Sequence, residues 1–464
     1  MIPIGEALSH EEQPPLTCEH LLALGRELAA SLKGETAGRL SVAVGSDPRP
    51  SSDMLASALT AGLCAAGADV LLLGMVPTPA VAFLTQKHGA AAGVMITGSH
   101  REAAVNGVKL FDRDGFFRPV PAEWMYAPPR PPAPEPGRVR PWRGAAEEYV
   151  THLLAASEVG LQGMRLAVDC ADGAAAATAE RLFSSLGAEC YMMNAGPDGS
   201  RINRDSGPLN TERLAEEVVR HKYFAGIALD GGAERCVLVD EKGNLLDGDK
   251  ILAALIYDRQ EKNLLPGGTV AVDAASNMGL CRFCEGLGIS AVTVTEPSGI
   301  AAELRRSGGV LGGGPAGFVL ETPYATTFDG QLAALRLLSL CRERGWKLSR
   351  AGALMERFPQ VMVSVRAGEE GKARFMLDSR LQSAVREAGE QLGHEGRVRA
   401  WVADAEPLIF VSAEGRDFEE INRLAVALAK EIGAAVGPAE EPETPGQPDG
   451  EAAVPADVRP LQTP

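Results

Sequence analysis

The sequence predicts an α/β protein built from several related domains. Strand-like apolar runs alternate with Ala/Leu-rich helical periodicity along almost the whole chain, which is typical of α/β layering. A length of 464 residues exceeds what one core normally supports and fits two to four domains. A strand that ends in an acidic residue occurs at 166–169 and again at 269–273, which indicates a repeated domain.

Residues 1–142 form the first predicted α/β domain. Its last part overlaps a Pro-rich stretch at 118–143, whose composition is typical of a linker. Before that stretch, the periodicity predicts a helix at 18–32, a strand at 40–44, a helix at 52–66, and strands at 70–73 and 93–97.

Three further domains and a tail follow. Residues 143–258 and 259–357 each begin near one of the two strand-then-acid motifs. Residues 358–436 predict a smaller α+β domain, with strands at 361–365, 398–402 and 408–413 and a closing helix. Residues 437–464 are rich in Pro, Glu and Gly, which predicts a disordered acidic tail.

Composition limits the partners and the compartment. A formal net charge of -16 argues against nucleic acid and against anionic membranes. No apolar run approaches a transmembrane span and no signal region is visible, so we expect a cytoplasmic protein without membrane insertion. Cys281 and Cys284 form a lone CxxC at helical spacing, which favours a buried helix face over a zinc site.

A serine on a tight turn is the first candidate site. Ser99 follows a predicted strand and Gly98, and His100 comes directly after it. Such a serine can be an exposed nucleophile, although the same pattern also occurs in ordinary turns at strand ends.

An acidic turn is the second candidate site. An apolar run ends at Asp230, and a strand resumes at 236–240. Carboxylates on alternate residues of such a loop suit Mg²⁺. Here Gly232 offers no ligand, and Glu234 is one carbon longer than an aspartate.

Motifs in a fixed order connect these sites to a known family. They are found at 44–49 with Ser51-Ser52, 74–79, Ser99-His100, 168–174, 197–199 with Ile202-Asn203, 247–249, 276–280, Thr326-Thr327 with Asp329-Gly330, 358–360 and 406–409. In this order they resemble the α-D-phosphohexomutases over residues 22–432. The Ile202-Asn203 and 276–279 motifs are most similar to the branch that contains the phosphoglucosamine mutases.

The resemblance implies a fold and a reaction. Three similar α/β/α domains and a smaller C-terminal α+β domain would surround a central cleft. Members of the family interconvert hexose 1- and 6-phosphates through a bisphosphorylated sugar. A phosphoserine at the position of Ser99 would donate and recover the phosphoryl group, assisted by Mg²⁺. Catalysis of this kind rests on positioning and on charge neutralisation.

The resemblance also assigns roles to individual residues. The implied catalytic residues are Ser99, His100, Lys109 and Arg49; the implied Mg²⁺ ligands are Asp230 and Glu234; the implied substrate-binding residues are Arg235, Gly313, Gly314 and Glu406. Lys109 and Arg49 could instead be solvated surface charges, and Arg235 could simply pair with a nearby acid. The motif at 247–249 is interpreted as a helix cap.

Several loops depart from the family pattern. The metal loop has lost an aspartate at Gly232, and the sugar loop at 312–318 lacks the family's Glu, Ser and His. The C-terminal phosphate loop at 401–407 carries Trp401 and Asp404 in place of basic and hydroxyl side chains. The scaffold motifs are retained while the substrate-facing motifs have changed.

Three functions are compatible with this pattern. The first is a catalytically degenerate homologue with a binding or regulatory role, whose partner is a mutase subunit or a diadenylate cyclase. The second is an active mutase, or one of altered specificity, that uses Ser99 on a hexose phosphate. The third is a sensor for a less anionic ligand, with Phe318 and Trp401 entering the cleft.

Overall fold

The computed structural model describes residues 6–8, 16–34, 38–196, 198–403 and 407–437. The chain forms two compact units, of which the first holds residues 1–273 and 284–355 and the second holds 274–283 and 356–464. Residues 438–464 of the predicted tail and Glu406 lie outside the described residues.

The first sheet of unit 1 has the strand order β1-β5-β4-β2-β3-β7, with β6 paired to β5. Strands β2, β3, β4 and β7 run parallel, and β5 is antiparallel to β4. Its strands are β1 (Glu6–Leu8), β2 (Ser41–Ser46), β3 (Asp69–Met75), β4 (Ala92–Ile96), β5 (Gly107–Asp112), β6 (Phe117–Arg118) and β7 (Val139–Pro141).

The Pro-rich stretch is more ordered than a linker. It contains a 3₁₀ turn, η1 (Ala122–Tyr126), and the edge strand β7, which extends the first sheet. Proline is tolerated there because an edge strand does not need every N–H for pairing. The prediction of a simple bridge at 118–143 was therefore wrong for its last part.

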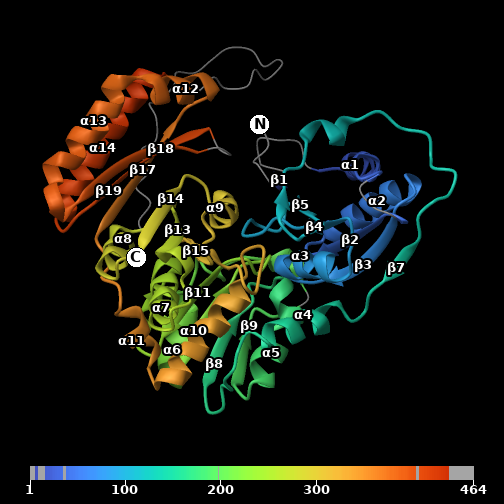
Figure 1. Ribbon diagram of the computed structural model, residues 1–464, viewed down its shortest axis with the longest axis horizontal. Coiled ribbons are helices and arrows are strands. Elements are labelled where there is room, and N and C mark those ends of the chain that lie inside the picture. The colour runs from blue at the N-terminus through green and yellow to red at the C-terminus, as the bar shows by residue number, and fades with distance from the viewer. Residues whose placement is uncertain (1–5, 9–15, 35–37, 197, 404–406, 438–464) are drawn as a thin grey trace. The chain divides into compact units, whose positions relative to one another are not determined.

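Helices cover both faces of this sheet (Figure 1). One face packs against α1 (Cys18–Ser31) and α2 (Ser52–Ala65) through a cluster of buried aliphatic side chains. The two helices lie close together at Gly62, since a Cβ at that position would be only 2.2 Å from the carbonyl oxygen of Leu22. The other face packs against α3 (Thr78–Lys87), whose Val81 side chain lies over Gly45.

The second sheet of unit 1 has the order β12-β11-β10-β8-β9, with β8 parallel to both β9 and β10. Its strands are β8 (Arg165–Asp169), β9 (Glu189–Met193), β10 (Ala225–Leu229), β11 (Cys236–Asp240) and β12 (Leu245–Leu246). The helical segments of this region are α4 (Ala145–Leu154), η2 (Ala174–Ala177), α5 (Ala179–Ser185), η3 (Gly199–Arg201), α6 (Glu212–His221) and α7 (Gly248–Glu261).

The third sheet has the order β14-β13-β15-β16, and β13 is parallel to both its neighbours. Its strands are β13 (Thr269–Asp273), β14 (Ser290–Val294), β15 (Leu311–Gly313) and β16 (Val319–Glu321). The helical segments are η4 (Pro266–Gly268), α8 (Met278–Gly286), α9 (Gly299–Ser307), α10 (Gly330–Arg344) and α11 (Leu348–Gly352).

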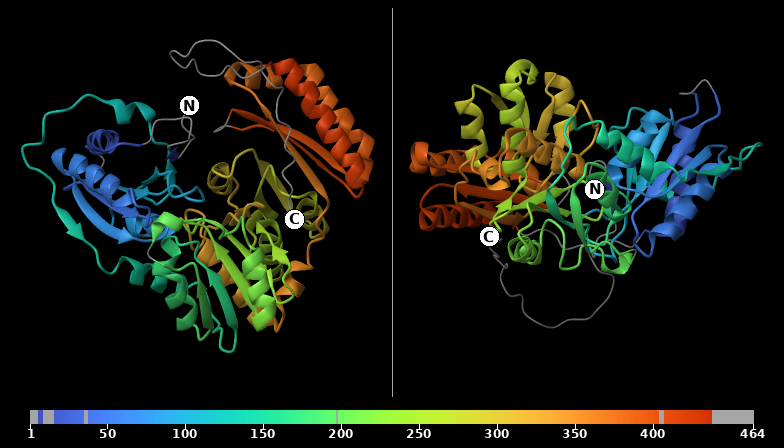
Figure 2. Two further views of the ribbon diagram at one scale, coloured as in Figure 1. Left: turned by 180° about the vertical axis from the view of Figure 1, so that it is seen from behind. Right: turned by 90° about the horizontal axis from the view of Figure 1, so that it is seen from below.

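Unit 2 has an antiparallel sheet with the order β17-β19-β18. Figure 2 shows its two long helices, α13 and α14, side by side along the sheet, and their apolar faces bury one continuous core. The elements are β17 (Gln360–Arg366), α12 (Glu369–Leu377), α13 (Ser379–Leu392), η5 (Gly393–Glu395), β18 (Arg397–Val402), β19 (Leu408–Glu414) and α14 (Phe418–Val436).

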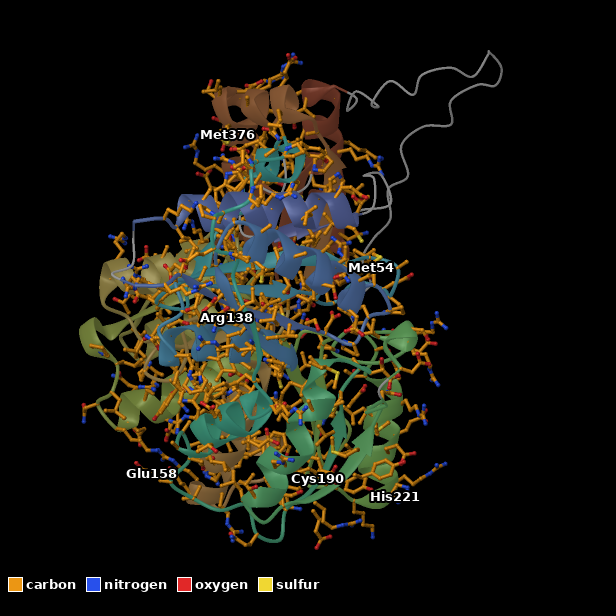
Figure 3. The ribbon with its side chains drawn as sticks, turned by 90° about the vertical axis from the view of Figure 1, so that its right-hand side faces the viewer. Met54, Arg138, Glu158, Cys190, His221 and Met376 are labelled. Carbon is orange, nitrogen blue, oxygen red and sulfur yellow. The ribbon has the colours of Figure 1, made fainter. Side chains whose placement is uncertain are left out.

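The surface of each unit carries exposed apolar side chains. Met54 of α2 in unit 1 and Met376 of α12 in unit 2 are both exposed (Figure 3). No helix in the described ranges is long and apolar enough to cross a membrane.

The predicted α/β class is confirmed, and so are the strand-then-acid repeats, which are β8 and β13. Asp247 is the N-cap of α7, as predicted, and accepts a hydrogen bond from the backbone N–H of Lys250 at 3.0 Å. The domain boundaries at 142, 258 and 357 remain predictions.

Candidate functional site

Ser99 lies on a strained turn directly after β4. Its φ of 52° is in the left-handed region, which costs a non-glycine residue about 1 kcal/mol. Its backbone N–H donates to the Thr97 hydroxyl at 2.8 Å, which fixes the turn. The side chain is buried, with only 3% of the residue exposed.

Arg49 holds this turn in place from within the first domain. Its guanidinium donates to the carbonyl oxygens of Ser99 at 3.1 Å and of Arg101 at 2.7 Å. It also donates to the carbonyl of Val105 at 2.7 Å, while Asp47 binds its Nε at 2.9 Å. Arg49 is thus a buried positioning residue, and the alternative of a solvated surface charge is wrong.

Two carboxylates face the Ser99 hydroxyl from the hairpin between β10 and β11. Asp230 Oδ2 lies 3.1 Å and Glu234 Oε2 lies 3.2 Å from Ser99 Oγ. The turn is fixed because Asp230 Oδ1 accepts the backbone N–H groups of Glu234 at 2.8 Å and Arg235 at 3.0 Å. A hydroxyl between two carboxylates has a ready acceptor for its proton.

Lys109 brings one positive charge to this group. It projects from β5, and its Nζ lies 2.5 Å from Glu234 Oε2. Both side chains are almost completely buried, so this is a desolvated ion pair rather than a surface one. The structure therefore brings Ser99, Lys109, Asp230 and Glu234 together.

His100 follows Ser99 but does not join these contacts. Its Nδ1 is buried without a hydrogen-bond partner among the described residues. Burial, followed by the charges of Arg235, Arg101 and Lys109, lowers the pKa of His100 to about 2. The imidazole is therefore neutral at any physiological pH and can serve as a donor or acceptor but not as a cation.

Of the predicted substrate-binding residues, the structure describes Arg235, Gly313 and Gly314. The guanidinium of Arg235 stacks on the ring of Phe318, 4.4 Å from its centroid. Phe318 packs in turn on Phe328, so its side chain is part of a small core. A Cβ at Gly314 would lie 2.5 Å from the Asp273 side chain, and one at Gly313 would lie 2.3 Å from a carbonyl oxygen. Both glycines are thus required by close packing.

Sequence reasoning missed two residues of this site. Asn203 donates to the carbonyl oxygens of Ser99 at 2.9 Å and Arg101 at 2.7 Å, and it accepts the N–H of Gly231. Its position in the Ile202-Asn203 motif was the available signal. Thr78, the first residue of α3, is buried next to Gly232, and its hydroxyl has no partner within the described chain.

The residues present do not fit the Mg²⁺ site that the resemblance implies. Mg²⁺ requires near-octahedral oxygen coordination. No group of three His, Cys, Asp or Glu side chains in the described ranges could hold a metal ion. Of the two carboxylates at Ser99, Glu234 already binds the ammonium of Lys109, and Gly232 adds no side chain.

Comparison with known protein families agrees with this architecture. The models for the α/β/α domains I, II and III of phosphoglucomutase/phosphomannomutase match residues 6–123, 147–243 and 247–358. Together they cover more than half of the chain. The chain belongs to the phosphoglucomutase/phosphomannomutase family, the α-D-phosphohexomutases.

The most similar curated relatives include phosphoglucosamine mutases. The one from Moorella thermoacetica is 40% identical over 433 residues, which cover 91% of this chain and 96% of the relative. The one from Caldicellulosiruptor saccharolyticus is 38% identical over 431 residues, covering 90% of this chain and 95% of the relative. The predicted family is therefore confirmed.

Solved structures share the fold at lower identity. A phosphoglucomutase/phosphomannomutase family protein from Burkholderia thailandensis matches with a TM-score of 0.79 and 22% identity, covering 95% of this chain and 99% of that one. The N-acetylphosphoglucosamine mutase of Aspergillus fumigatus, solved with GlcNAc-6P and magnesium, gives 0.59 and 18%, covering 78% and 93%. The predicted architecture of three α/β/α domains with a further domain is confirmed.

Proposed function

We propose that this chain is a catalytically degenerate phosphohexomutase that acts in the cytoplasm as a binding or regulatory protein. The charge balance around Ser99 carries the proposal. Its hydroxyl faces Asp230 and Glu234, and the ammonium of Lys109 is already bound to Glu234. A phosphoryl group would add almost two negative charges at this point.

Arg49, which lies next to the Ser99 turn, does not offset that charge. Arg49 is buried, and its guanidinium is aimed at backbone carbonyls and Asp47, which fix the turn. A phosphoserine at position 99 would therefore be held beside two carboxylates, one of which is already paired with Lys109. Phosphoryl transfer depends on charge neutralisation, so we expect turnover to be weak or absent.

The proposed binding partner is a second protein that recognises the retained scaffold, either an active mutase subunit or a diadenylate cyclase. The support is the contrast within the chain, since scaffold motifs such as the one around Asn277 persist while the loops at 230–235 and 312–318 have changed. Asn277 still bridges to Phe358 by two hydrogen bonds of 3.0 Å in unit 2.

One observation favours a second candidate, an active mutase or one of altered specificity. Ser99 keeps a left-handed backbone that a merely structural turn would more readily give to glycine. Strain retained at a nucleophile is typical of functional sites. The substrate would then be a hexose phosphate, and Lys109 would be the principal cation of the site.

An isomerisation assay separates the two. The purified protein is incubated with glucosamine 6-phosphate or glucose 1-phosphate, Mg²⁺ and a hexose bisphosphate primer, beside a Ser99→Ala control. We expect no turnover above the control. Turnover that disappears in Ser99→Ala would overturn the degenerate assignment and establish the mutase. A gel-filtration test with purified diadenylate cyclase and with an active phosphoglucosamine mutase then examines the partner.

A further inference from the structure

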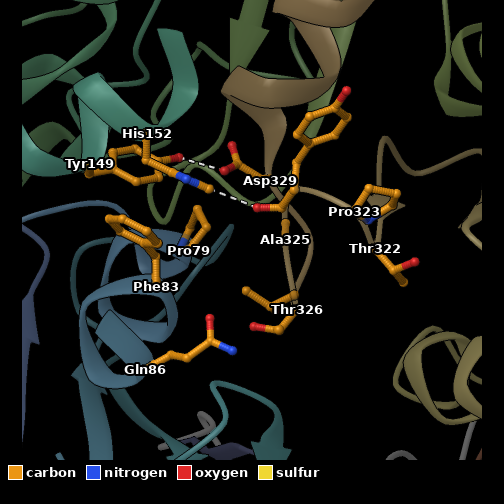
Figure 4. A pocket seen from close by; sticks show the side chains of 12 residues that line it. Pro79, Phe83, Gln86, Tyr149, His152, Thr322, Pro323, Ala325, Thr326 and Asp329 are labelled. Atoms are coloured by element: carbon orange, nitrogen blue, oxygen red, sulfur yellow. Dashed lines mark hydrogen bonds between the residues drawn. The ribbon is translucent and has the colours of Figure 1, made fainter. Parts of the chain in front are cut away.

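A cavity lies in unit 1 between α3, α4 and the segment that precedes α10. Figure 4 shows Phe83 and Gln86 of α3 on one side and Thr322 and Thr326 of the segment before α10 on the other. Its volume is about 240 Å³. Pockets for drug-sized ligands usually span roughly 300–1,000 Å³, so this one suits a molecule of about one sugar ring.

The lining combines one carboxylate with neutral hydrogen-bonding groups. Asp329 is the acid, and Tyr149 donates to its Oδ2 at 2.7 Å (Figure 4). Its Oδ1 accepts the backbone N–H of Leu332 at 2.9 Å. Each carboxylate oxygen can accept a further hydrogen bond. The hydroxyl of Thr327, a lining residue only 2% exposed, has no partner in the described part of the chain.

Positive charge does not line this cavity. None of its described lining residues is lysine or arginine. Two cations lie near its aromatic lining, Lys87 at 5.5 Å from the centroid of Phe83 and Arg336 at 5.1 Å from that of Tyr324, but both are paired. Lys87 binds Glu148 at 2.6 Å and Arg336 binds Glu321 at 3.2 Å. Because these two cations are already paired with Glu148 and Glu321, a phosphate would meet the charge of Asp329 with little compensation, whereas an ammonium group would be attracted to it.

An aromatic wall completes the cavity. The Phe83 ring stacks on His152 with centroids 4.0 Å apart, and His152 Nε2 is held by the carbonyl of Tyr324 at 2.7 Å. Burial lowers the pKa of His152, so the stacked pair is neutral. A ring with one apolar face can pack against the Phe83–His152 pair, while the amide of Gln86 and the threonine hydroxyls accept its polar edges.

We infer that this cavity binds a small hydroxylated primary amine of sugar-ring size that carries no phosphate, with its ammonium group at Asp329. The inference is independent of any turnover at Ser99. A ligand in this cavity would also be connected to the acidic turn through the backbone. The N–H of Thr78 donates to the carbonyl oxygen of Gly232, and the N–H of Gly330 donates to that of Ala233, both at 3.0 Å.

The test uses glucosamine, glucose and glucosamine 6-phosphate as probes in calorimetric titrations of the full chain. Glucosamine should bind with a dissociation constant of about 1 mM, which is ordinary for one sugar ring. Glucose, which has a hydroxyl in place of the ammonium, should bind about tenfold more weakly. Hydrogen exchange should slow in peptides covering Thr78 and Gly330, and not in peptides of β17 and β19.

Variants locate the site. Asp329→Asn keeps the shape and the N-cap of α10 and should remove the preference for glucosamine over glucose. Gln86 is exposed, so the Gln86→Leu variant should fold normally and bind glucosamine several-fold more weakly. Gln162 is also exposed, and Gln162→Leu serves as the matched control.

The inference would be overturned if the native chain did not bind glucosamine, or if Asp329→Asn kept the preference for glucosamine over glucose. Tighter binding of glucosamine 6-phosphate with protection of the same peptides would also overturn it.

Discussion

Lys109 Nζ and Glu234 Oε2 lie 2.5 Å apart in a buried ion pair that joins the first two sheets of unit 1. The lysine comes from β5 and the glutamate from the turn after β10, so 125 residues separate them in the chain. The same carboxylate oxygen lies 3.2 Å from the Ser99 hydroxyl. A protein cation is therefore bound to one of the two carboxylates that contact the serine.

Removing the lysine should leave a buried carboxylate uncompensated. We expect Lys109→Met to destabilise unit 1 by about 3–5 kcal/mol, the usual cost of breaking a buried pair from one side. The measurement is chemical denaturation of the variant and of the native chain.

The matched control removes both charges. Lys109→Met with Glu234→Gln should recover most of the lost stability, because no unpaired charge remains. Equal destabilisation by the single and double variants would show that packing, and not the charge pair, controls this position.

Gly232→Asp should create a cation site at the acidic turn. A Cβ at this position would lie 2.9 Å from the Thr78 hydroxyl and 3.1 Å from Glu234 Oε2, so the new carboxylate would join the two acids. Three clustered carboxylates repel one another, so in the absence of metal the variant should melt at a lower temperature than the native chain. Mg²⁺ should then raise its midpoint, with no comparable shift for the native chain or for Gly232→Asn.

Arg49→Lys should loosen the Ser99 turn. The guanidinium serves several carbonyls and Asp47 at once, and a single ammonium cannot reproduce that fork. We expect a loss of roughly 2–4 kcal/mol and faster hydrogen exchange in peptides covering 98–105. Unchanged exchange there, with the stability lost elsewhere, would contradict a positioning role.

Asp329 should make stability depend on pH. Burial raises the pKa of its carboxyl to about 6, so the folded chain keeps a proton that the unfolded chain releases above about pH 4. Stability therefore falls as pH rises from about 4 to 6 and is not regained above that window. Asp329→Asn lacks this titration and should be more stable than the native chain at pH 7.5, by up to about 3 kcal/mol.

The comparison between the two chains is made at each pH, so other titrating groups cancel. The advantage of Asp329→Asn should shrink towards zero near pH 3.5, where the native carboxyl is protonated in both states. A difference that stays constant across this range would mean that Asp329 is not a buried charge.

Much of the fold could be predicted from local pattern. Period-two and helical periodicities located β2, α1 and α2 to within two residues at either end, because each buries one regular face. The segment at 139–141 could not be predicted in this way. Its pairing with β3 depends on an available sheet edge, and its own residues are exposed and include a proline.

The sequence by itself determined the fold class and the family motifs. It also singled out Arg49, Lys109, Asp230 and Glu234 around Ser99, but not Asn203 or Thr78. It could not show that Lys109 and Glu234 form an ion pair, or that the guanidinium of Arg49 donates to backbone carbonyl oxygens. Nor could it show that Asp329 and Phe83 line the same cavity. Each of these depends on side chains from segments far apart in the chain. Only folding brings such groups into a low-dielectric interior, where a single contact decides whether a charge is available to a ligand.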